Sequence, residues 1–290
     1  MILRIATRKS PLALWQANHV YDLIRSVDRS LKVFLVPIQT KVDKNLDLKI
    51  SDFGGKGAFS KEVQELLLSA RADIAVHSAK DLEVESPKGL QIAAYPTRGN
   101  VHDALVGSKL ENLEHGATVA TGSNRRKALL LEQRPDLNII ELRGNIDTRL
   151  KKLGSVDALV MASCALDRLN KSPDVVEELD PDVFIPQVGQ GALAVEARDD
   201  DFQILELLKS IDHQPTRLAV ETERSFLRQL GGDCDLPAGA RAVRFGSELK
   251  IRGFLSDDDG QVARAEVRGF ERQEPGKRLA QRLVEMHSRK

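Results

Sequence analysis

The sequence has little cysteine, no net charge and no long apolar run. Its two cysteines, Cys164 and Cys234, are too few for a disulfide framework or a cysteine-based zinc cluster. Lys plus Arg and Asp plus Glu both total 43, so the charge balance gives no reason to expect nucleic acid or an anionic membrane as a partner. Apolar stretches such as 158–166 are far shorter than the roughly 20 residues that span a bilayer.

Other signatures are missing as well. The six histidines show no metal-ligand spacing, so no metal site is expected. Solenoid repeats and low-complexity tracts are absent. The first residues, MILRIATRKS, are typical of a short strand with cations at its edge rather than of a charged leader with an apolar core and a cleavage site. Together with the sparing use of cysteine, these absences predict a soluble cytoplasmic protein.

The composition is that of a folded protein with more than one domain. Apolar residues make up 41% and charged residues 30%, a mixture that allows a buried core beneath a polar surface. At 290 residues the chain exceeds what one hydrophobic core usually serves, so two or three domains are expected.

Strand-like apolar stretches alternate with helical patterns along much of the chain. This alternation is typical of βαβ units and of sheets with parallel strands, here in two similar lobes. The predicted strands are 2–7, 33–39, 73–77, 117–121, 139–142 and 158–162, and the predicted helices are 12–25, 61–70, 125–133 and 148–153. The stretch 186–198 is predicted to carry the chain back to the first lobe. The rest resembles a small α+β domain, with helices at 216–230 and 277–287 and strands at 249–255 and 262–268.

Arginine recurs where the predicted strands end. The carboxyl ends of parallel strands open onto a crevice flanked by helix N-termini, where ligands bind. Arginine offers a planar, permanently charged fork that matches carboxylates. A hydrogen bond to a charged group in a sheltered cleft is worth about 1.5–3 kcal/mol, against about 0–1 kcal/mol for an exposed ion pair. The joint pattern therefore predicts one cleft for a polycarboxylate ligand, although each arginine alone is better explained as a solvated helix residue. The arginines concerned are Arg8, Arg125, Arg126, Arg143 and Arg149.

Asp81 is the acid that these cations flank most closely, in the stretch HSAKD. A carboxylate here could stabilise positive charge on a substrate nitrogen or handle protons in an elimination. A helix N-cap is an equally good interpretation, because Asp is a favoured cap residue. His77 is interpreted as a packed strand-end histidine rather than a base.

Two loops carry further candidates. GGKGAF, at 54–59, lacks the full phosphate-loop pattern, so a glycine-rich lid with Lys56 and Phe59 is favoured over a nucleotide site. Cys234 lies in the loop GGDCDLPAGA and is a candidate nucleophile or attachment point. Its aspartate neighbours tend to raise the pKa of the thiol, which favours one modification over repeated turnover. Cys164, inside VMASCAL, is interpreted as core packing.

Eight stretches together resemble the porphobilinogen deaminase family. No single stretch is decisive, but their order and spacing match the family through nearly the whole chain. They are ATRKSPLALWQ, GGKGAFSKE, DIAVHSAKD, SNRRKALL, RGNIDTRLKKL, DALVMASCALDRL, VGQGALAVE and ERSFLRQLGGDCDLPAGA.

The resemblance implies an α/β fold with two periplasmic-binding-protein-like lobes of type II and a small C-terminal α+β domain. The first domain would comprise 1–96 and 192–211, and the second 97–191. The third, 212–290, would carry the cofactor-attachment loop. The family also leads us to expect a monomer.

The resemblance further implies an enzyme, hydroxymethylbilane synthase, that condenses four porphobilinogen molecules head to tail with loss of ammonia. The chain would grow on a dipyrromethane cofactor joined by a thioether to Cys234, and hydrolysis would release hydroxymethylbilane. The product would pass to uroporphyrinogen-III synthase. Every added ring brings an acetate and a propionate, which agrees with the arginine pattern.

Motif position assigns a role to each candidate. Asp81 is expected to be catalytic and to stabilise positive charge on pyrrole nitrogens. The other cofactor contacts are expected to be Ser78, Lys80, Thr121, Ser123, Arg125 and Arg126. The incoming porphobilinogen is expected to contact Arg8, Ser10, Arg143, Arg149, Arg168 and Gln190.

A few positions depart from the family pattern. Ala79 stands where methionine is common, and Asn124 where leucine precedes the paired arginines. Val101 and His102 replace a frequent Pro-Arg, and Asp233 replaces a second glycine before the cysteine. None of these departures removes a proposed catalytic group. They bear on hinge behaviour, packing at the cofactor and loading of the thiol.

Two alternatives share some of these features. A two-lobed binding protein for a small polycarboxylate would use the same arginines without a reaction, but the expected lack of an export signal and the loop cysteine count against it. A thiol-dependent transferase with an acyl substrate would need a base near Cys234, where the sequence offers aspartates rather than histidine.

Overall fold

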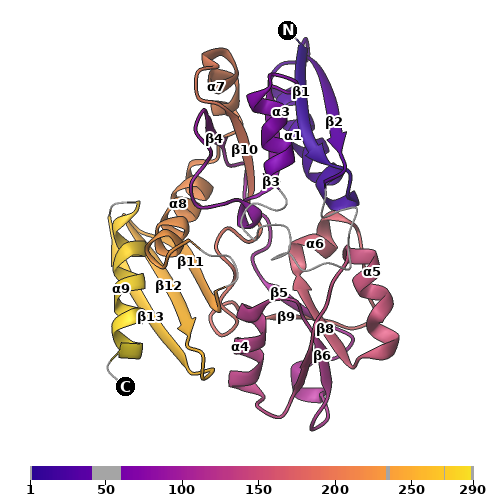
Figure 1. Cartoon of the computed structure of the whole chain (residues 1–290), viewed down its shortest axis with the longest axis vertical. Coiled ribbons are helices and arrows are strands. Elements are labelled where there is room, and N and C mark those ends of the chain that lie inside the picture. Colours follow the sequence, from indigo (N-terminus) through magenta and orange to yellow (C-terminus); the bar gives the residue numbers. More distant parts are fainter. Residues whose placement is uncertain (1, 41–59, 233–235, 271, 289–290) are drawn as a thin grey trace. The chain divides into compact units, whose positions relative to one another are not determined.

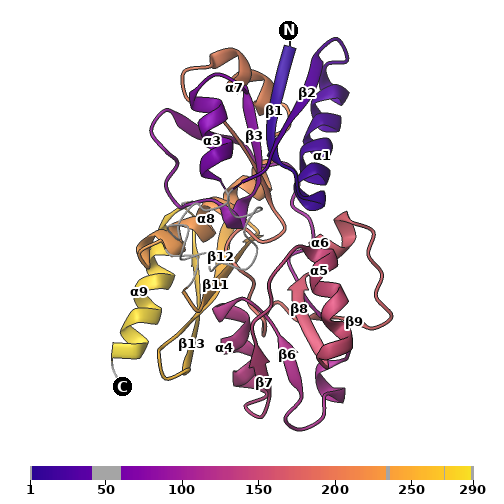
Figure 2. The same cartoon turned by 45° about the vertical axis from the view of Figure 1, so that its right-hand side comes forward.

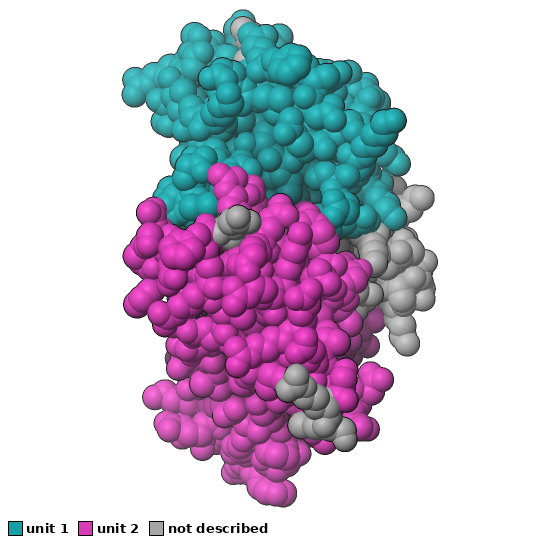
Figure 3. Space-filling view, turned by 90° about the vertical axis from the view of Figure 1, so that its left-hand side faces the viewer, with its two compact units in different colours: residues 1–99, 191–218 teal, residues 100–190, 219–290 magenta. Residues whose placement is uncertain are grey.

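The computed structural model describes residues 2–40, 60–232, 236–270 and 272–288. The chain forms two compact units, each built from two separate segments (Figure 3). Unit 1 comprises residues 1–99 and 191–218, and unit 2 comprises residues 100–190 and 219–290.

Unit 1 is built on a five-stranded sheet in the order β2-β1-β3-β10-β4 (Figure 1). β1 pairs in parallel with β2 and β3, whereas β10 is antiparallel to both β3 and β4. The strand β10 is far along the sequence from its two neighbours, so the second segment of unit 1 completes the sheet of the first. The strands are β1 (Ile2–Arg8), β2 (Lys32–Ile38), β3 (Ile74–Ser78), β4 (Leu90–Ala94) and β10 (Leu193–Arg198).

Helices cover both faces of this sheet. Alternate residues of β1 point to opposite faces, as the period of two in a strand requires. Ile5 packs with α1 (Pro11–Val27) and α7 (Phe202–Lys209), whereas Ala6 packs with α3 (Lys61–Leu68). The sheet is therefore buried on both sides, and ligand-binding groups are left to the loops at its edges.

Unit 2 contains a second five-stranded sheet with the same pattern, in the order β7-β6-β8-β5-β9 (Figure 2). β6 pairs in parallel with β7 and β8, and β5 is antiparallel to β8 and β9. The strands are β5 (Asp103–Val106), β6 (Thr118–Ala120), β7 (Asn138–Ile140), β8 (Ala158–Ala162) and β9 (Val176–Leu179). Its helices are α4 (Asn124–Gln133), α5 (Ile146–Leu150) and α6 (Ser163–Arg168), with short 3-10 turns η3 (Leu110–Asn112) and η4 (Lys151–Ser155).

A small three-stranded antiparallel sheet completes unit 2. Its strands are β11 (Ala238–Phe245), β12 (Glu248–Ser256) and β13 (Val262–Gly269). The helix α9 (Glu274–Ser288) belongs with it, and so does α8 (Gln214–Gln229) from residue 219 onward. Its own core includes Phe226, Ile251 and Leu279. Phe254 of β12 instead packs into the core of the neighbouring five-stranded sheet.

The expected α/β architecture is confirmed. Two sheets of the same topology form the two lobes, and a smaller three-stranded sheet with helices follows them along the chain. The three-domain division expected from the family remains a prediction, since packing groups the small sheet with the second lobe. Among the described residues, no helix is both long and apolar enough to span a membrane.

Candidate active site

A pocket in unit 1 brings together four of the candidate residues. It lies where β1 and β3 end and α1 and α3 begin, the edge at which the carboxyl ends of parallel strands meet. The polar residues that line it are Arg8, Ser10, Gln16, Ser60, His77, Ser78 and Asp81. The pocket therefore combines a guanidinium group, a carboxylate and several hydroxyl groups.

Asp81 presents its carboxylate at this pocket. It is the last residue of η2 (Ala79–Asp81), a single 3-10 turn that directly follows β3, and it is exposed. The N-cap position of that turn is Ser78, so the alternative interpretation of Asp81 as an N-cap is wrong. Within the described part of the chain, the carboxylate of Asp81 has no ion-pair partner, which suits a group that must face a positive charge on a ligand.

Two hydroxyl groups of the pocket hold the backbone and side chains around it. The Ser10 hydroxyl accepts a hydrogen bond from the Ala13 N–H at 3.3 Å and so caps α1. The Gln16 amide donates to the Ser78 hydroxyl at 2.8 Å, which links α1 to the end of β3. These contacts fix the strand-to-helix junction from which Arg8 projects.

A buried histidine and glutamate lie behind the pocket. His77 Nε2 is 3.1 Å from Glu196 Oε2, and Glu196 also accepts from the Gln64 amide at 2.9 Å and from the Ser86 hydroxyl at 3.4 Å. Burial alone would raise the pKa of Glu196, but the contacts with His77, Gln64 and Ser86 hold it below its ordinary value. His77 is buried, as the sequence indicated, yet its ring is paired with a charge rather than only packed.

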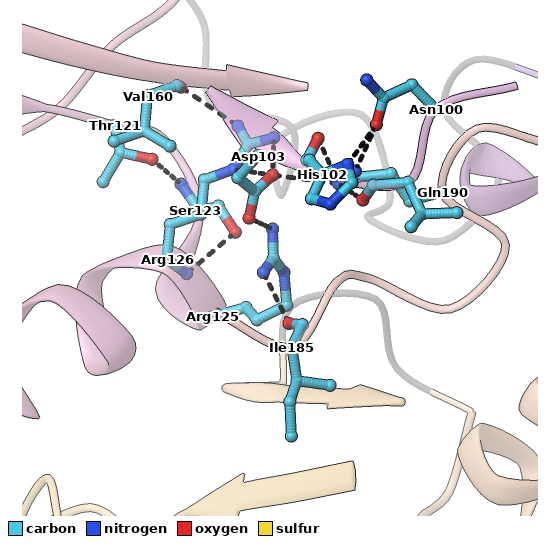
Figure 4. Close-up of polar contacts among 11 residues, drawn as sticks. Asn100, His102, Asp103, Thr121, Ser123, Arg125, Arg126, Val160, Ile185 and Gln190 are labelled. Atoms are coloured by element: carbon cyan, nitrogen blue, oxygen red, sulfur yellow. Dashed lines mark hydrogen bonds and ion pairs between the residues drawn. The ribbon is translucent and has the colours of Figure 1, made fainter. Parts of the chain in front are cut away.

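In unit 2, Arg125 and Arg126 converge on one buried carboxylate, that of Asp103 (Figure 4). Arg125 Nη2 lies 2.6 Å from Asp103 Oδ2, and Arg126 donates to Oδ1 through Nε at 3.0 Å and Nη2 at 2.8 Å. Arg125 Nη1 donates to the Ile185 carbonyl, and Arg126 Nη1 to the Val160 carbonyl. Both guanidinium groups are thus held at fixed positions in the lobe.

Burial makes this cluster electrostatically unusual. Arg125 is 3% exposed, Arg126 7% and Asp103 0%. Burial would raise the pKa of Asp103, but the two guanidinium charges outweigh it and keep the pKa well below its ordinary value. Burial lowers the pKa of Arg125, although Asp103 opposes this. Two cations against one carboxylate leave a surplus positive charge, and a further anion would compensate it.

Three other candidates surround this cluster. Ser123 is the N-cap of α4 and accepts from the Arg126 N–H at 3.4 Å, while Thr121 accepts from the Ser123 N–H at 3.3 Å. Gln190 is fully buried, and its amide donates to Asp103 Oδ1 at 3.0 Å and to the Val101 carbonyl at 2.8 Å. Gln190 therefore touches the buried carboxylate rather than presenting its amide to solvent.

The remaining arginines lie elsewhere in unit 2. Arg143 follows β7 and pairs with Glu141, with 2.8 Å between Nε and Oε1. Arg149 of α5 donates from Nε to the Gly144 carbonyl at 2.8 Å. Arg168 ends α6, and burial lowers its pKa. Arg8 belongs to unit 1, whereas these three arginines, Arg125 and Arg126 belong to unit 2.

Some candidates are not placed. Lys56, Phe59 and Cys234 lie outside the described residues, and so does Asp233. Lys80 is half-buried in η2, between Ala79 and Asp81. Cys164 is buried in α6, as expected for core packing.

Sequence reasoning missed the two buried acids, Asp103 and Glu196. Each lies in or beside a strand whose other residues are apolar, DALV for Asp103 and LAVEAR for Glu196. A carboxylate in a buried strand requires a cation or several donors, because an unpaired buried charge is costly. An acidic residue within an apolar, strand-like run was therefore the feature of the sequence that could have indicated a buried charge with partners.

Comparison with known proteins gives a consistent result. The family model described as "Porphobilinogen deaminase, dipyromethane cofactor binding domain" matches residues 3–206, and "Porphobilinogen deaminase, C-terminal domain" matches residues 217–285. A porphobilinogen deaminase from Nitratidesulfovibrio vulgaris (strain DP4) is 47% identical over 270 residues, which cover 89% of this chain and 84% of that protein. One from Roseiflexus sp. (strain RS-1) is 44% identical over 272 residues, covering 92% and 90%.

Among solved structures, the periplasmic aliphatic sulphonate binding protein SsuA from Escherichia coli matches with a TM-score of 0.43 at 16% identity, over 72% of this chain and 67% of that one. The family resemblance seen in the sequence is confirmed by the two family models and by the relatives. Since the models together span most of the sequence and the relatives align over about nine tenths of it, the chain belongs to the porphobilinogen deaminase family.

Proposed function

We propose that this protein is a hydroxymethylbilane synthase, which condenses four porphobilinogen molecules head to tail with release of ammonia and then hydrolyses off hydroxymethylbilane. The observation that carries the proposal is the pocket of unit 1, where the exposed carboxylate of Asp81 faces the same space as Arg8 and Ser10. A guanidinium group suits the acetate and propionate of a pyrrole, and a carboxylate suits its nitrogen when that nitrogen becomes positively charged.

We further propose that a dipyrromethane cofactor is attached through a thioether to Cys234. When bound, the cofactor supplies a terminal pyrrole with a free α-carbon, to which each new unit is added. The description of the matching family model names this cofactor. The surplus positive charge of Arg125 and Arg126 over Asp103 fits a group that carries several carboxylates. Ser78, Lys80, Thr121 and Ser123 are proposed to complete its binding site.

Asp81 is the proposed catalytic residue. Loss of ammonia from porphobilinogen places positive charge on its pyrrole nitrogen, and the terminal pyrrole of a bound cofactor would develop such a charge as the chain is extended. A fixed carboxylate that faces such a nitrogen lowers the energy of the charged state, and it can accept the proton that is lost when the aromatic ring is restored. The position of Asp81 on a short turn at the end of β3 holds its carboxylate at the pocket.

The remaining arginines are proposed to bind the carboxylates of the incoming porphobilinogen. They are Arg8 with Ser10 in unit 1, and Arg143, Arg149 and Arg168 in unit 2. Gln190 is proposed to act through its contact with Asp103. Lys56 and Phe59 are proposed to belong to a lid over the site, and the protein is proposed to be a cytoplasmic monomer that passes its product to uroporphyrinogen-III synthase.

The purified protein tests the proposal directly. Incubation with porphobilinogen should release four molecules of ammonia for each hydroxymethylbilane formed. A two-lobed binding protein for a polycarboxylate would bind porphobilinogen without releasing ammonia. Absence of ammonia release from a folded protein that carries its cofactor would refute the proposed activity.

A further inference from the structure

The buried carboxylate of Asp103 lies at the centre of the polar cluster in unit 2. Asp103 is the first residue of β5, where it stands opposite Ala162 on β8 and Leu179 on β9. Figure 4 shows the side chains of Arg125, Arg126 and Gln190 converging on it from three directions. All four side chains are at least nine-tenths buried.

The placement of these arginines works against the helix that carries them. Arg125 and Arg126 lie in the first turn of α4, where the helix dipole is positive and where acidic residues are favoured. No acidic residue occupies that first turn. Two cations at this end, taken out of water, would repel both the dipole and each other. The arrangement therefore depends on a negative charge supplied from another element.

Asp103 supplies that charge and also fixes the geometry. It accepts from Arg126 through two nitrogens and from Arg125 through one, so one carboxylate joins the two guanidinium groups, each of which also donates to a backbone carbonyl. Gln190 donates to the same oxygen as Arg126 and anchors itself on the Val101 and His102 carbonyls. Among the described residues, Asp103 is the one carboxylate that contacts either guanidinium group. A charge surplus remains, and Arg125 Nε has no hydrogen-bond partner there although it is buried.

We propose that Asp103, held by Gln190, is a positioning residue that orients Arg125 and Arg126 to receive the carboxylates of the cofactor. This inference rests on the proposed function and deepens it. Asp103 neutralises one of the two charges, so that the pair can be buried, and leaves the other for an anionic ligand. Replacement of its carboxylate by an amide would keep the shape of the side chain but would remove the charge that holds the guanidinium groups together.

The test compares Asp103→Asn with Asp73→Asn. Asp73 forms a more exposed ion pair in unit 1, with 2.7 Å between its Oδ1 and Arg4 Nη2, and it is outside the proposed site. Intact-mass measurement of each purified variant gives the fraction of chains that carry the dipyrrole adduct, and thermal unfolding shows how far each is destabilised. Asp103→Asn should lose about tenfold or more in adduct fraction, the effect of losing one well-placed hydrogen bond to a charged group. Asp73→Asn should carry the adduct in full.

Steady-state kinetics on the loaded fraction separate positioning from general damage. Asp103→Asn chains that carry the adduct should keep kcat within about threefold, because Asp81 is unaltered. Asp103→Asn chains without the adduct should load slowly when porphobilinogen is added. If Asp103→Asn does not fold, Gln190→Met decides the question, since it keeps the Asp103 carboxylate and removes the amide that donates to Oδ1 and to the Val101 and His102 carbonyls. This variant should load more slowly than the wild type. Full loading at the wild-type rate in Asp103→Asn, or in Gln190→Met when the first variant is unfolded, would overturn the inference. An equal loss of adduct in Asp73→Asn would overturn it too. A wild-type chain with no adduct would instead count against the proposed function.

Discussion

His77 Nε2 lies 3.1 Å from Glu196 Oε2 across the antiparallel pair of strands β3 and β10. Glu196 stands opposite Ala75, two residues from His77, so both side chains project from the same face of the sheet. The later segment of the chain thus contributes a buried charge directly behind the pocket that holds Asp81. The strand β10, which lies between β3 and β4 in the first sheet, therefore pairs with β3, the strand that leads to the proposed catalytic residue Asp81.

Replacement of His77 by phenylalanine tests what this pair contributes. Glu196 would remain buried with only the Gln64 amide and the Ser86 hydroxyl as donors. The free energy of unfolding at neutral pH should fall by about 3 kcal/mol, as expected when a buried carboxylate loses one of its partners. Denaturant unfolding measures the change. His115→Phe, at an exposed position of unit 2, is the matched control and should shift stability by at most about 0.5 kcal/mol. Equal stability of the two variants would show that the contact between His77 and Glu196 does not stabilise the fold.

Replacement of Asp81 by asparagine should remove turnover while leaving the cofactor in place. The amide keeps the shape of the side chain but cannot neutralise a positive pyrrole nitrogen or accept its proton. We expect kcat to fall by about 100-fold or more, the usual contribution of such a group. Asp22→Asn, at an exposed position of α1, should retain full activity. An Asp81→Asn enzyme that carries the adduct and turns over at the wild-type rate would show that Asp81 is not catalytic.

The pH dependence of stability should report on Asp103. Because its pKa in the folded protein is below the ordinary value, its contribution is fully present above the unfolded-state pKa of about 3.9 and is lost as the pH falls through the lower folded value. At pH 7, Asp103→Asn should be less stable than the wild type by about 3 to 5 kcal/mol. This difference should shrink progressively below about pH 4. Denaturant unfolding at several pH values measures it, and a difference that stays constant into acid would be inconsistent with a buried ionised Asp103.

Replacement of Gly276 by alanine tests the contact between α9 and α8. A Cβ atom at this position would overlap the Ser225 hydroxyl and the Thr222 carbonyl oxygen and would lie 2.8 Å from the Phe226 nitrogen, so backbone as well as a side chain would have to move. Gly276→Ala should therefore destabilise the protein by about 1–3 kcal/mol, the usual effect of overpacking, despite the higher helix propensity of alanine. Gly154→Ala, where a Cβ would meet nothing within 4 Å, is the control. A neutral Gly276→Ala would mean that the two helices can separate at little cost.

The periodic elements were the most predictable part of the fold. The strand expected at 158–162 is β8 without change, and the helices expected at 12–25 and 125–133 lie within α1 and α4. A helix that buries one face shows a periodic apolar pattern, and a fully buried strand shows a short continuous apolar run. Both patterns can be read from the local sequence. The helix expected at 148–153 instead begins at Ile146, where Asn145 caps it, and continues as the 3-10 turn η4.

Short strands and charge partners were not predictable in the same way. β5, β9 and β4 were missed, because strands of four or five residues that depend on neighbours from distant segments carry little local pattern. The candidate residues Arg8, Ser10 and Asp81 could be placed at strand ends from sequence, and they line one pocket. The burial of Arg125 and Arg126 against Asp103 depends on a contact over more than 20 residues, and no local rule specifies it.

The central claim is that the protein carries a dipyrrole on Cys234 and extends it. Intact-mass measurement of the purified wild-type chain tests this most directly. The account predicts a mass above that of the sequence by one dipyrrole unit, rising in further pyrrole steps when porphobilinogen is added, and no such increment in Cys234→Ala. A wild-type chain at its sequence mass that gains nothing from porphobilinogen would contradict it.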